Sequence, residues 1–141
     1  MTYADAQLNC QNKFGNFGIL FEPRDANTNE LVFAAAGNLR LGGYWLGIND
    51  LANQGQYVYA SDGQEVVNGM WYSGQPKGDN YTRCVLGYYD GRGYLGEWFD
   101  YICGKAYHSI CQTITGNIIL NIIDIDMYTV AKVVYPKYCK G

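Results

Sequence analysis

Charge is scarce in this sequence, and the charged residues do not cluster. Asp, Glu, Lys and Arg make up 16% of the 141 residues, where about 25% is usual for a globular domain. Lys and Arg number 10 against 13 Asp and Glu, which gives a formal net charge of -3. Because no basic run offers a face for a phosphate backbone, nucleic acid is excluded as the expected partner.

Catalytic groups and membrane-length apolar runs are also lacking. His108 is the only histidine, and neither a nucleophile nor a second imidazole stands beside it, so a zinc site or a nucleophilic dyad lacks its parts. A carboxylate pair such as Glu97 and Asp100 could act as acid and base, yet the weight of the sequence is against an enzyme. The longest apolar run, residues 118–127, is interrupted by polar residues and is shorter than the roughly 18 residues that a membrane helix needs.

The sequence opens without the basic and apolar regions of a signal peptide. Its cysteines match no C-x-x-C metal or redox pattern, and two disulfides with one leftover thiol are the simplest arrangement. Because persistent disulfides indicate an oxidising compartment, a signal would lie upstream of this sequence, or a first exon is missing. The cysteines are Cys10, Cys84, Cys103, Cys111 and Cys139.

Capping patterns predict two helices near the start of the chain. Thr2-x-x-Asp5 opens one over residues 2–14, which Gly15 ends, and Asn27-x-x-Glu30 opens another over about 27–36, which Gly37 ends. Short apolar runs then predict strands, and the polar stretch 71–83 predicts a long loop. This order of elements is typical of an α+β domain. The predicted extended segments are 17–21, 45–48, 57–59, 84–86, 101–103 and 108–111.

Residues 91–96 satisfy the G-x-G-x-x-G pattern of dinucleotide-binding proteins. That fingerprint requires a preceding strand and a following helix. Here a strand-like segment, Glu97 to Cys103, follows instead. A tight hairpin is the better interpretation.

A set of motifs resembles the C-type lectin-like domain family. It comprises Cys10, Trp45-Leu46-Gly47-Ile48, Ser61-Asp62-Gly63, Trp71, Gln75-Pro76, Cys84, Trp98-Phe99-Asp100, Cys103 and Ile110-Cys111-Gln112, in the family's order. The resemblance covers residues 1–112 and implies two helices packed on short antiparallel sheets with a long binding loop. It also implies disulfides Cys10–Cys111 and Cys84–Cys103, which leave Cys139 unpaired. Trp45 and Ile48 are expected in the core.

Sugar binding in this family uses a Ca²⁺ ion held by oxygen ligands from the long loop and the neighbouring strand. Of the five ligand positions that the resemblance carries over, Gln75 and Asp100 keep the family's residues, and these are the metal-ligand candidates. The other three are Lys77, Thr82 and Phe99. An ammonium repels a cation, and calcium requires about 6–8 oxygens, so we expect weak or absent calcium dependence and no required cofactor.

Two rearrangements would compensate for the lost ligands. Asp79 and Asn80 could supply replacement oxygens if the loop folded differently from the family's. Alternatively, the Lys77 ammonium could replace the metal by pairing with Asp100.

The expected function is a secreted, extracellular carbohydrate-binding module. The candidate ligand-binding residues are Gln75, Lys77, Asp79, Asn80 and Asp100, with tyrosines 72, 81, 88, 89 and 94 around the loop as stacking platforms. The same Tyr-rich composition suits protein recognition, so an extracellular protein partner is the alternative. Asn80-Tyr81-Thr82 is an N-glycosylation sequon, which is either used or idle.

Residues 113–141 form an atypical C-terminal extension. The resemblance implies a first strand that pairs with the last one and that this chain starts too late to contain. The β-branched run 118–123 is predicted to fold back antiparallel on residues 108–113 and cover that edge. The alternative is that the extension is foreign to the fold, as a gene-model read-through would be.

Overall fold

In a computed structural model, the described residues are 1–88 and 96–113 in full and 117–122 and 131–136 as backbone. Cys139, Tyr89, Tyr94 and most of the G-x-G-x-x-G segment lie outside them. Among the described residues, neither helix is long and apolar enough to cross a membrane.

The first helix, α1 (Tyr3–Phe14), forms as its sequence predicts. The Thr2 hydroxyl accepts a hydrogen bond from the Asp5 backbone N–H at 3.3 Å, which satisfies one free donor of the first turn. Gly15 ends the helix with φ 69°, a backbone conformation that glycine adopts at little cost.

The second helix, α2 (Ala26–Asn38), differs from the predicted range. Its N-cap is Asp25 instead of Asn27, because the Asp25 carboxylate accepts both the backbone N–H and the hydroxyl of Thr28, at 2.8 and 2.9 Å. A carboxylate at this position also interacts favourably with the helix dipole. Gly37 does not end the helix, which continues to Asn38.

The central strand is β2 (Gly43–Asn49), whose residues are all buried. It pairs antiparallel with β4 (Cys84–Tyr88) on one side and parallel with β6 (His108–Thr113) on the other. The sheet is therefore mixed and not purely antiparallel as predicted. The remaining strands of this part are β1 (Gly18–Leu20), β3 (Val58–Tyr59) and β5 (Trp98–Tyr101). Residues 102–103, predicted as strand, lie beyond the end of β5.

Both edges of β6 are occupied. On one side β1 pairs with it antiparallel, and on the other β7 (Asn117–Ile122) pairs antiparallel through Ile110 with Ile122 and Cys111 with Asn121. β7 pairs in turn with β8 (Ala131–Pro136). We propose that β7 is the edge strand expected from residues 118–123, and that it replaces the first strand of the family fold.

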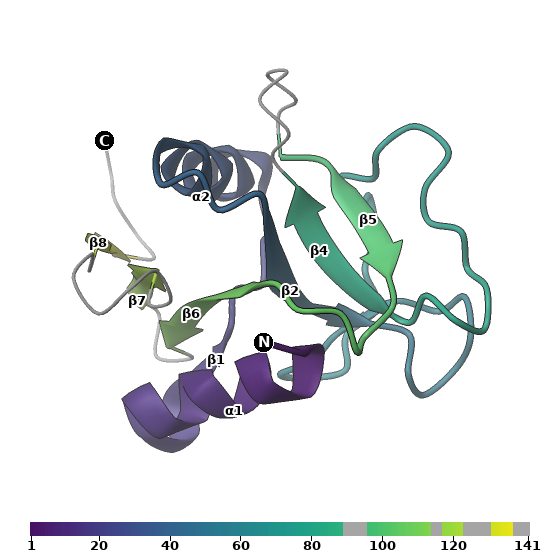
Figure 1. The fold of residues 1–141 in the computed structure, drawn as a ribbon, viewed down its shortest axis with the longest axis horizontal. Coiled ribbons are helices and arrows are strands. Elements are labelled where there is room, and N and C mark those ends of the chain that lie inside the picture. Colours follow the sequence, from purple (N-terminus) through teal and green to yellow (C-terminus); the bar gives the residue numbers. More distant parts are fainter. Residues whose placement is uncertain (89–95, 114–116, 123–130, 137–141) are drawn as a thin grey trace.

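The two helices lie beside the sheet at separate places (Figure 1), and two apolar clusters hold them to it. One lies between the sheet and α2 and includes Ile48, and the other lies against α1 and includes Trp45. Both side chains are 0% exposed, so the core prediction for them is confirmed. Trp45 also donates its indole N–H to the Met1 carbonyl at 3.0 Å.

The two disulfides implied by the resemblance are confirmed. Cys10–Cys111 joins α1 to β6 with a Cα–Cα distance of 5.4 Å. Cys84–Cys103 joins the start of β4 to the turn after β5 at 5.2 Å. Together they fix the first helix and the base of the long loop to the sheet.

The two disulfides are expected to stabilise the fold unequally. Cys10–Cys111 closes a loop of sequence separation 101 and Cys84–Cys103 one of 19. Since the longer loop restricts the unfolded chain more, a Cys10→Ser/Cys111→Ser double variant should lose about 4–5 kcal/mol and Cys84→Ser/Cys103→Ser about 3 kcal/mol. Denaturant unfolding of both variants measures the difference. An equal or reversed order would contradict the chain-entropy argument.

Candidate functional site

The candidate site lies where the segment between β3 and β4 passes beside β5, on the side of the sheet away from the two helices (Figure 1). Four of the predicted ligand residues, Gln75, Lys77, Asp79 and Asn80, belong to this segment, residues 60–83, which we call the long loop. The fifth, Asp100, lies on β5. The fold therefore brings Asp100 to the loop.

The Asp100 carboxylate joins the long loop to the sheet. Its side chain is 0% exposed, and its Oδ2 atom accepts hydrogen bonds from the Tyr57 hydroxyl at 2.7 Å, the Gly78 backbone N–H at 2.8 Å and the Thr82 hydroxyl at 3.2 Å. Burial, together with the bond to Asp100, raises the pKa of Tyr57 well above its usual range. The phenol therefore stays protonated and donates.

Asp79 organises the turn that precedes β4. Its Oδ1 atom accepts from the backbone N–H groups of Tyr81 and Thr82 at 2.9 and 2.8 Å and from the Thr82 hydroxyl at 2.8 Å. These bonds, with the Thr82 hydroxyl first, lower the pKa of Asp79 below its usual 3.8. Since Thr82 also reaches Asp100, the two carboxylates share one hydroxyl as a link.

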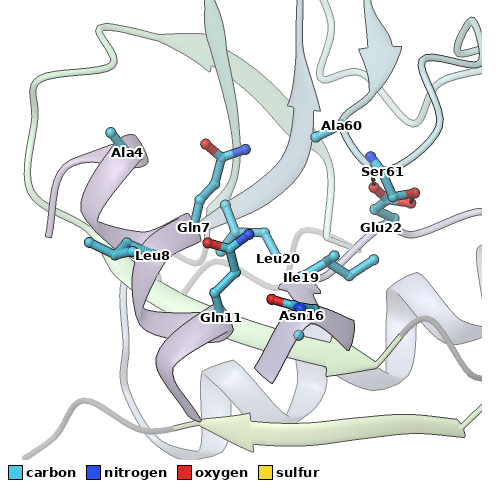
Figure 2. Close-up of a pocket in the computed structure, with 11 residues that line it drawn as sticks. Ala4, Gln7, Leu8, Gln11, Asn16, Ile19, Leu20, Glu22, Ala60 and Ser61 are labelled. Carbon is cyan, nitrogen blue, oxygen red and sulfur yellow. Dashed lines mark hydrogen bonds between the residues drawn. The ribbon is translucent and has the colours of Figure 1, made fainter. Parts of the chain in front are cut away.

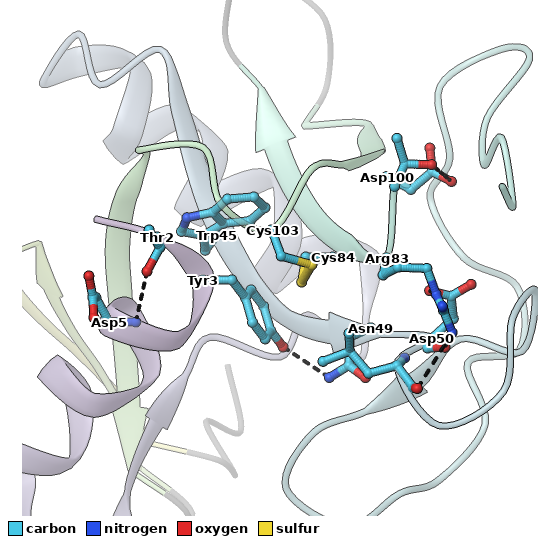
Figure 3. Close-up of a disulfide and its surroundings, with 12 residues drawn as sticks. Thr2, Tyr3, Asp5, Trp45, Asn49, Asp50, Arg83, Cys84, Asp100 and Cys103 are labelled. Atoms are coloured by element: carbon cyan, nitrogen blue, oxygen red, sulfur yellow. Dashed lines mark hydrogen bonds and ion pairs between the residues drawn. A yellow bond between two sulfur atoms is a disulfide. The ribbon is translucent and has the colours of Figure 1, made fainter. Parts of the chain in front are cut away.

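Arg83 ties the end of the loop to the turn after β2 (Figure 3). Its Nε lies 3.0 Å from Oδ1 of Asp50, which is 0% exposed, and its Nη2 donates to the Asp50 carbonyl at 2.6 Å. The other Asp50 oxygen accepts from the Gly55 backbone N–H at 2.7 Å. Arg83 Nη1 also donates to Oδ1 of Asn80 at 3.3 Å. Asp50 is buried whereas the Arg83 side chain is 20% exposed, so removing Arg83 would leave an uncompensated buried carboxylate, which makes the pair an effective anchor.

The predicted pairing of Lys77 with Asp100 is wrong. Lys77 is exposed and forms no ion pair within 4.0 Å among the described residues. Its Nζ instead lies 5.9 Å from the centre of the Tyr101 ring. The Asp100 carboxylate is stabilised by the Gly78 N–H and two hydroxyls, so a neutral set of donors fills the place that the ammonium was expected to take.

The donor set does not fit a resident calcium ion. Oε1 of Gln75 and Oδ1 of Asp100 are buried without a hydrogen-bond partner in the described part of the chain, so of the five ligand positions implied by the resemblance these two each keep an open side-chain oxygen. Calcium needs about 6–8. The Phe99 ring supplies none. No group of three or more His, Cys, Asp or Glu side chains among the described residues could hold a metal ion.

The replacement oxygens proposed for calcium are engaged in part. Oδ1 of Asp79 accepts three hydrogen bonds within its turn, and Oδ1 of Asn80 accepts from Arg83. Using either of these two atoms for a cation would break contacts that give the loop its shape, whereas Oδ2 of Asp79 takes no part in them. The described part of the loop is held by contacts between protein groups.

Aromatic side chains line the face of the β4–β5 pair that is turned toward the apolar cluster beside α1. Trp98 and Asp100 are buried on the opposite face, while Phe99 and Tyr101 alternate to this one, pack against the edge of that cluster and are half-buried. Tyr72 stacks on Phe99 at 4.9 Å with 20° between the rings, and Tyr88 meets the Phe99 edge at 5.9 Å. We call Tyr72, Tyr88, Phe99, Tyr101 and Tyr107 the aromatic face.

Sequence reasoning identified Tyr72 and Tyr88 but missed the role of Phe99 and Tyr101 in this face. It considered Phe99 only as a lost oxygen ligand. The alternation of residues 98–101 is the signal that would have placed Phe99 and Tyr101 together on one side. Tyr81, also predicted near the loop, is 77% exposed.

A hollow of about 500 Å³ lies between α1 and β1, away from the ligand candidates of the long loop. The side chains of Gln7, Gln11 and Asn16 project into it (Figure 2). Glu22 lies at one end, where its oxygens are taken by Arg24 and by the backbone N–H and hydroxyl of Ser61. The hollow contains none of the residues that the sequence predicts for binding.

The Tyr57–Asp100 bond is expected to contribute measurably to stability. Tyr57→Phe removes a donor from a buried carboxylate, which should cost about 1.5–3 kcal/mol. Tyr59→Phe is the matched control, since the Tyr59 hydroxyl makes only a 3.4 Å bond to the Pro23 carbonyl, and it should cost less than about 1 kcal/mol. Denaturant unfolding compares them, and equal losses would show that Asp100 is not the junction described.

Acid is expected to open the turn at Asp79. Because the pKa of Asp79 is lowered in the folded state, its contribution is fully present above the ordinary pKa and is lost as the pH falls through the lower, folded value. Hydrogen exchange at the Tyr81 and Thr82 amides should accelerate relative to the intrinsic rate as the pH falls below the ordinary pKa of 3.8. Asp79→Asn keeps one acceptor oxygen without the charge, so it should flatten this profile; an unchanged profile would count against the assignment.

The geometry agrees with the comparisons. The family model described as Lectin C-type domain matches residues 1–113. Collectin-11 from Bos taurus is 32% identical over 114 residues, which cover 78% of this chain and 39% of the relative. An alpha-N-acetylgalactosamine-specific lectin from Patiria pectinifera is 31% identical over 123 residues, covering 82% of this chain and 70% of the relative.

The fold is likewise shared with solved structures. The C-type lectin CEL-I from Cucumaria echinata superimposes with a TM-score of 0.67 at 22% identity, covering 79% of this chain and 81% of that chain. The chain spans about two-fifths of the length of the collectins that it matches. From the matched model, the sequence relatives and the shared fold, the chain belongs to the C-type lectin domain family.

Proposed function

We propose that this chain is an extracellular carbohydrate-binding module that recognises a glycan without calcium, through the aromatic face and the adjoining long loop. The observation that carries the proposal is the stack of Tyr72 on Phe99 with Tyr88 at its edge. Rings in this arrangement present broad, half-exposed faces that the apolar C–H side of a sugar ring can cover.

Polar groups at the edge of the aromatic face would orient the bound sugar through hydrogen bonds. Lys77 is exposed beside the Tyr101 ring, and its ammonium can donate to sugar hydroxyls. Gln75 lies beside Tyr72, to whose carbonyl its backbone N–H donates at 2.8 Å, and its buried Oε1 atom has no hydrogen-bond partner among the described residues, so its side chain would have to turn outward to accept from a sugar. An apolar platform with a few convergent polar groups is the usual composition of a small-molecule site.

The Asp100 junction supports the absence of calcium from the proposed mechanism. In this chain, Tyr57, Gly78 and Thr82 donate to the buried carboxylate, and Arg83 holds the loop end to Asp50. Positioning is therefore performed by side chains and backbone before any ligand arrives. The residues that touch the ligand bind and orient it, and no bond is made or broken.

Two further observations support a sugar ligand in an extracellular setting. One relative is an alpha-N-acetylgalactosamine-specific lectin by its name. The two disulfides require an oxidising compartment for their persistence.

Asp79 and Asn80, which are engaged in the loop's own contacts, act in this proposal as positioning residues.

Recognition of an extracellular protein is the second candidate, favoured by a separate set of exposed apolar side chains. Tyr81 is 77% exposed and Leu51 54% exposed. Arg83 contacts the carbonyls of Asp50 and Leu51 and the side chain of Asn80, which places these two side chains on neighbouring segments. Tyrosine is among the residues most often found as anchors of protein interfaces.

A glycan array with and without chelator tests the proposal. Binding to at least one glycan should be unchanged by the chelator. Tyr72→Ala should then lower the affinity for that glycan roughly tenfold, since aromatic contacts contribute on the order of 1 kcal/mol beyond buried area. Phe17→Ala is the matched control, because Phe17 is 59% exposed but lies beside α1, and it should leave affinity unchanged.

Circular dichroism of each variant confirms that the fold is kept. Binding that disappears with chelator would refute calcium independence. No glycan bound at any calcium concentration would refute the sugar ligand and leave the protein partner as the better proposal.

A further inference from the structure

We propose that Asn80 is a glycosylation site, and that the sugar is added before the long loop closes. Asn80-Tyr81-Thr82 is the only N-x-[ST] sequence in the chain, a pattern that accepts N-linked glycans in secreted proteins. The inference rests on the extracellular location in the proposed function and not on its sugar ligand. It rests on how the fold treats the two chemically active side chains of this sequence, Asn80 and Thr82.

The amide nitrogen of Asn80 is available in the folded protein. The side chain is exposed, and its Oδ1 atom accepts from Arg83 at 3.3 Å. Nδ2 has no hydrogen-bond partner among the described residues. Because Arg83 is itself held by the buried Asp50, the contact fixes the amide through its oxygen and leaves the nitrogen toward solvent. A sugar on Nδ2 therefore breaks no contact of the folded loop.

Thr82 is not available in the folded protein. It is 5% exposed, and its hydroxyl contacts Oδ1 of Asp79 at 2.8 Å and Oδ2 of Asp100 at 3.2 Å. A transferase that recognises the hydroxyl of the third sequon residue must therefore bind the chain before these two hydrogen bonds form. The order of events follows: transfer first, loop closure second.

The chemical step is a substitution at the anomeric carbon of a lipid-pyrophosphate-linked oligosaccharide. A bond forms between Asn80 Nδ2 and that carbon as the bond from the carbon to the pyrophosphate oxygen breaks. The lipid pyrophosphate leaves with the electron pair, and Nδ2 gives up one proton to a base of the transferase. No oxidation or reduction takes place.

The glycan on Asn80 would extend into the solvent next to the Tyr81 side chain. That side chain is one of the exposed apolar groups that favour a protein partner, whereas the rings of the aromatic face lie on β4, β5 and the other part of the loop. A glycan at Asn80 would therefore hinder protein recognition at Tyr81 first.

The first test is expression of the full chain behind a secretory leader in a eukaryotic host. The secreted protein should lose mass on treatment with a peptide-N-glycanase, and peptide mapping should place the modification on Asn80. Asn80→Gln should abolish it and Thr82→Ser should retain it. Asn53→Gln, at an exposed asparagine outside any sequon, is the matched control and should change nothing. Secreted wild-type protein without a glycan would overturn the site.

The second test addresses the order of events. Unmodified protein from a bacterial host is offered to an oligosaccharyltransferase with its lipid-linked donor, once folded and oxidised and once reduced and unfolded. The unfolded chain should be modified at Asn80 and the folded chain should not. Equal modification of both would refute the proposed order while leaving the site itself intact.

Discussion

The constraint on which this site depends is the burial of one carboxylate. Asp100 faces the core side of β5 and is closed off from solvent, and an isolated carboxylate there would be strongly disfavoured. It is tolerated because donors converge on it from the end of the β2–β3 connection, from the tip of the long loop and from the turn before β4. The need to satisfy that charge is therefore what draws the loop against the sheet, and the loop in turn frames the aromatic face.

Around this junction the fold uses anchors with distinct roles. Cys10–Cys111 fixes α1 to β6, and Cys84–Cys103 fixes the place where the loop enters β4 (Figure 3). The buried pair of Asp50 and Arg83 then determines where the loop ends relative to the turn after β2. In Figure 3 the Tyr3 hydroxyl accepts from the Asn49 amide at 3.1 Å in the same neighbourhood. Burial raises the pKa of Tyr3 to about 12, which keeps its hydroxyl protonated.

Local signals in the sequence were sufficient for much of the framework. The Thr2 cap, the apolar run around Trp45 and the cysteine pairs were all predicted, because each is visible within a few residues or is fixed by the family's order of motifs. The start of α2 was misplaced since Asp25 and Asn27 are both acceptable caps, and only the folded chain shows that the backbone N–H and the hydroxyl of Thr28 both bond to Asp25. The parallel pairing of β2 with β6 has no local signal, because it joins residues far apart in the chain.

The sequence predicted which residues belong to the candidate site, but not which groups they contact. Asp100 and its loop neighbours were identified by position, but the charged Lys77 was one of the two alternatives considered for replacing the metal, by pairing with Asp100. Charge alone favours that choice. The observed partners of Asp100 include the Gly78 backbone N–H and the Tyr57 phenol, which is 43 positions away. They become evident only in the fold, where Asp100 is buried and the Lys77 ammonium is exposed. Contacts of that kind depend on the tertiary fold and leave no periodic trace in the sequence.

A loop locked by its own donors has a consequence for how a bound molecule would leave. Receptors that grip through an exchangeable ion can be emptied by removing the ion. Under the calcium-free recognition proposed above, side chains and backbone position the loop, so chelation or a drop in the concentration of divalent cations should leave a bound molecule in place. A ligand bound to this surface would instead dissociate by competition, by dilution, or where the pH is low enough to protonate the Asp79 carboxylate that shapes the turn.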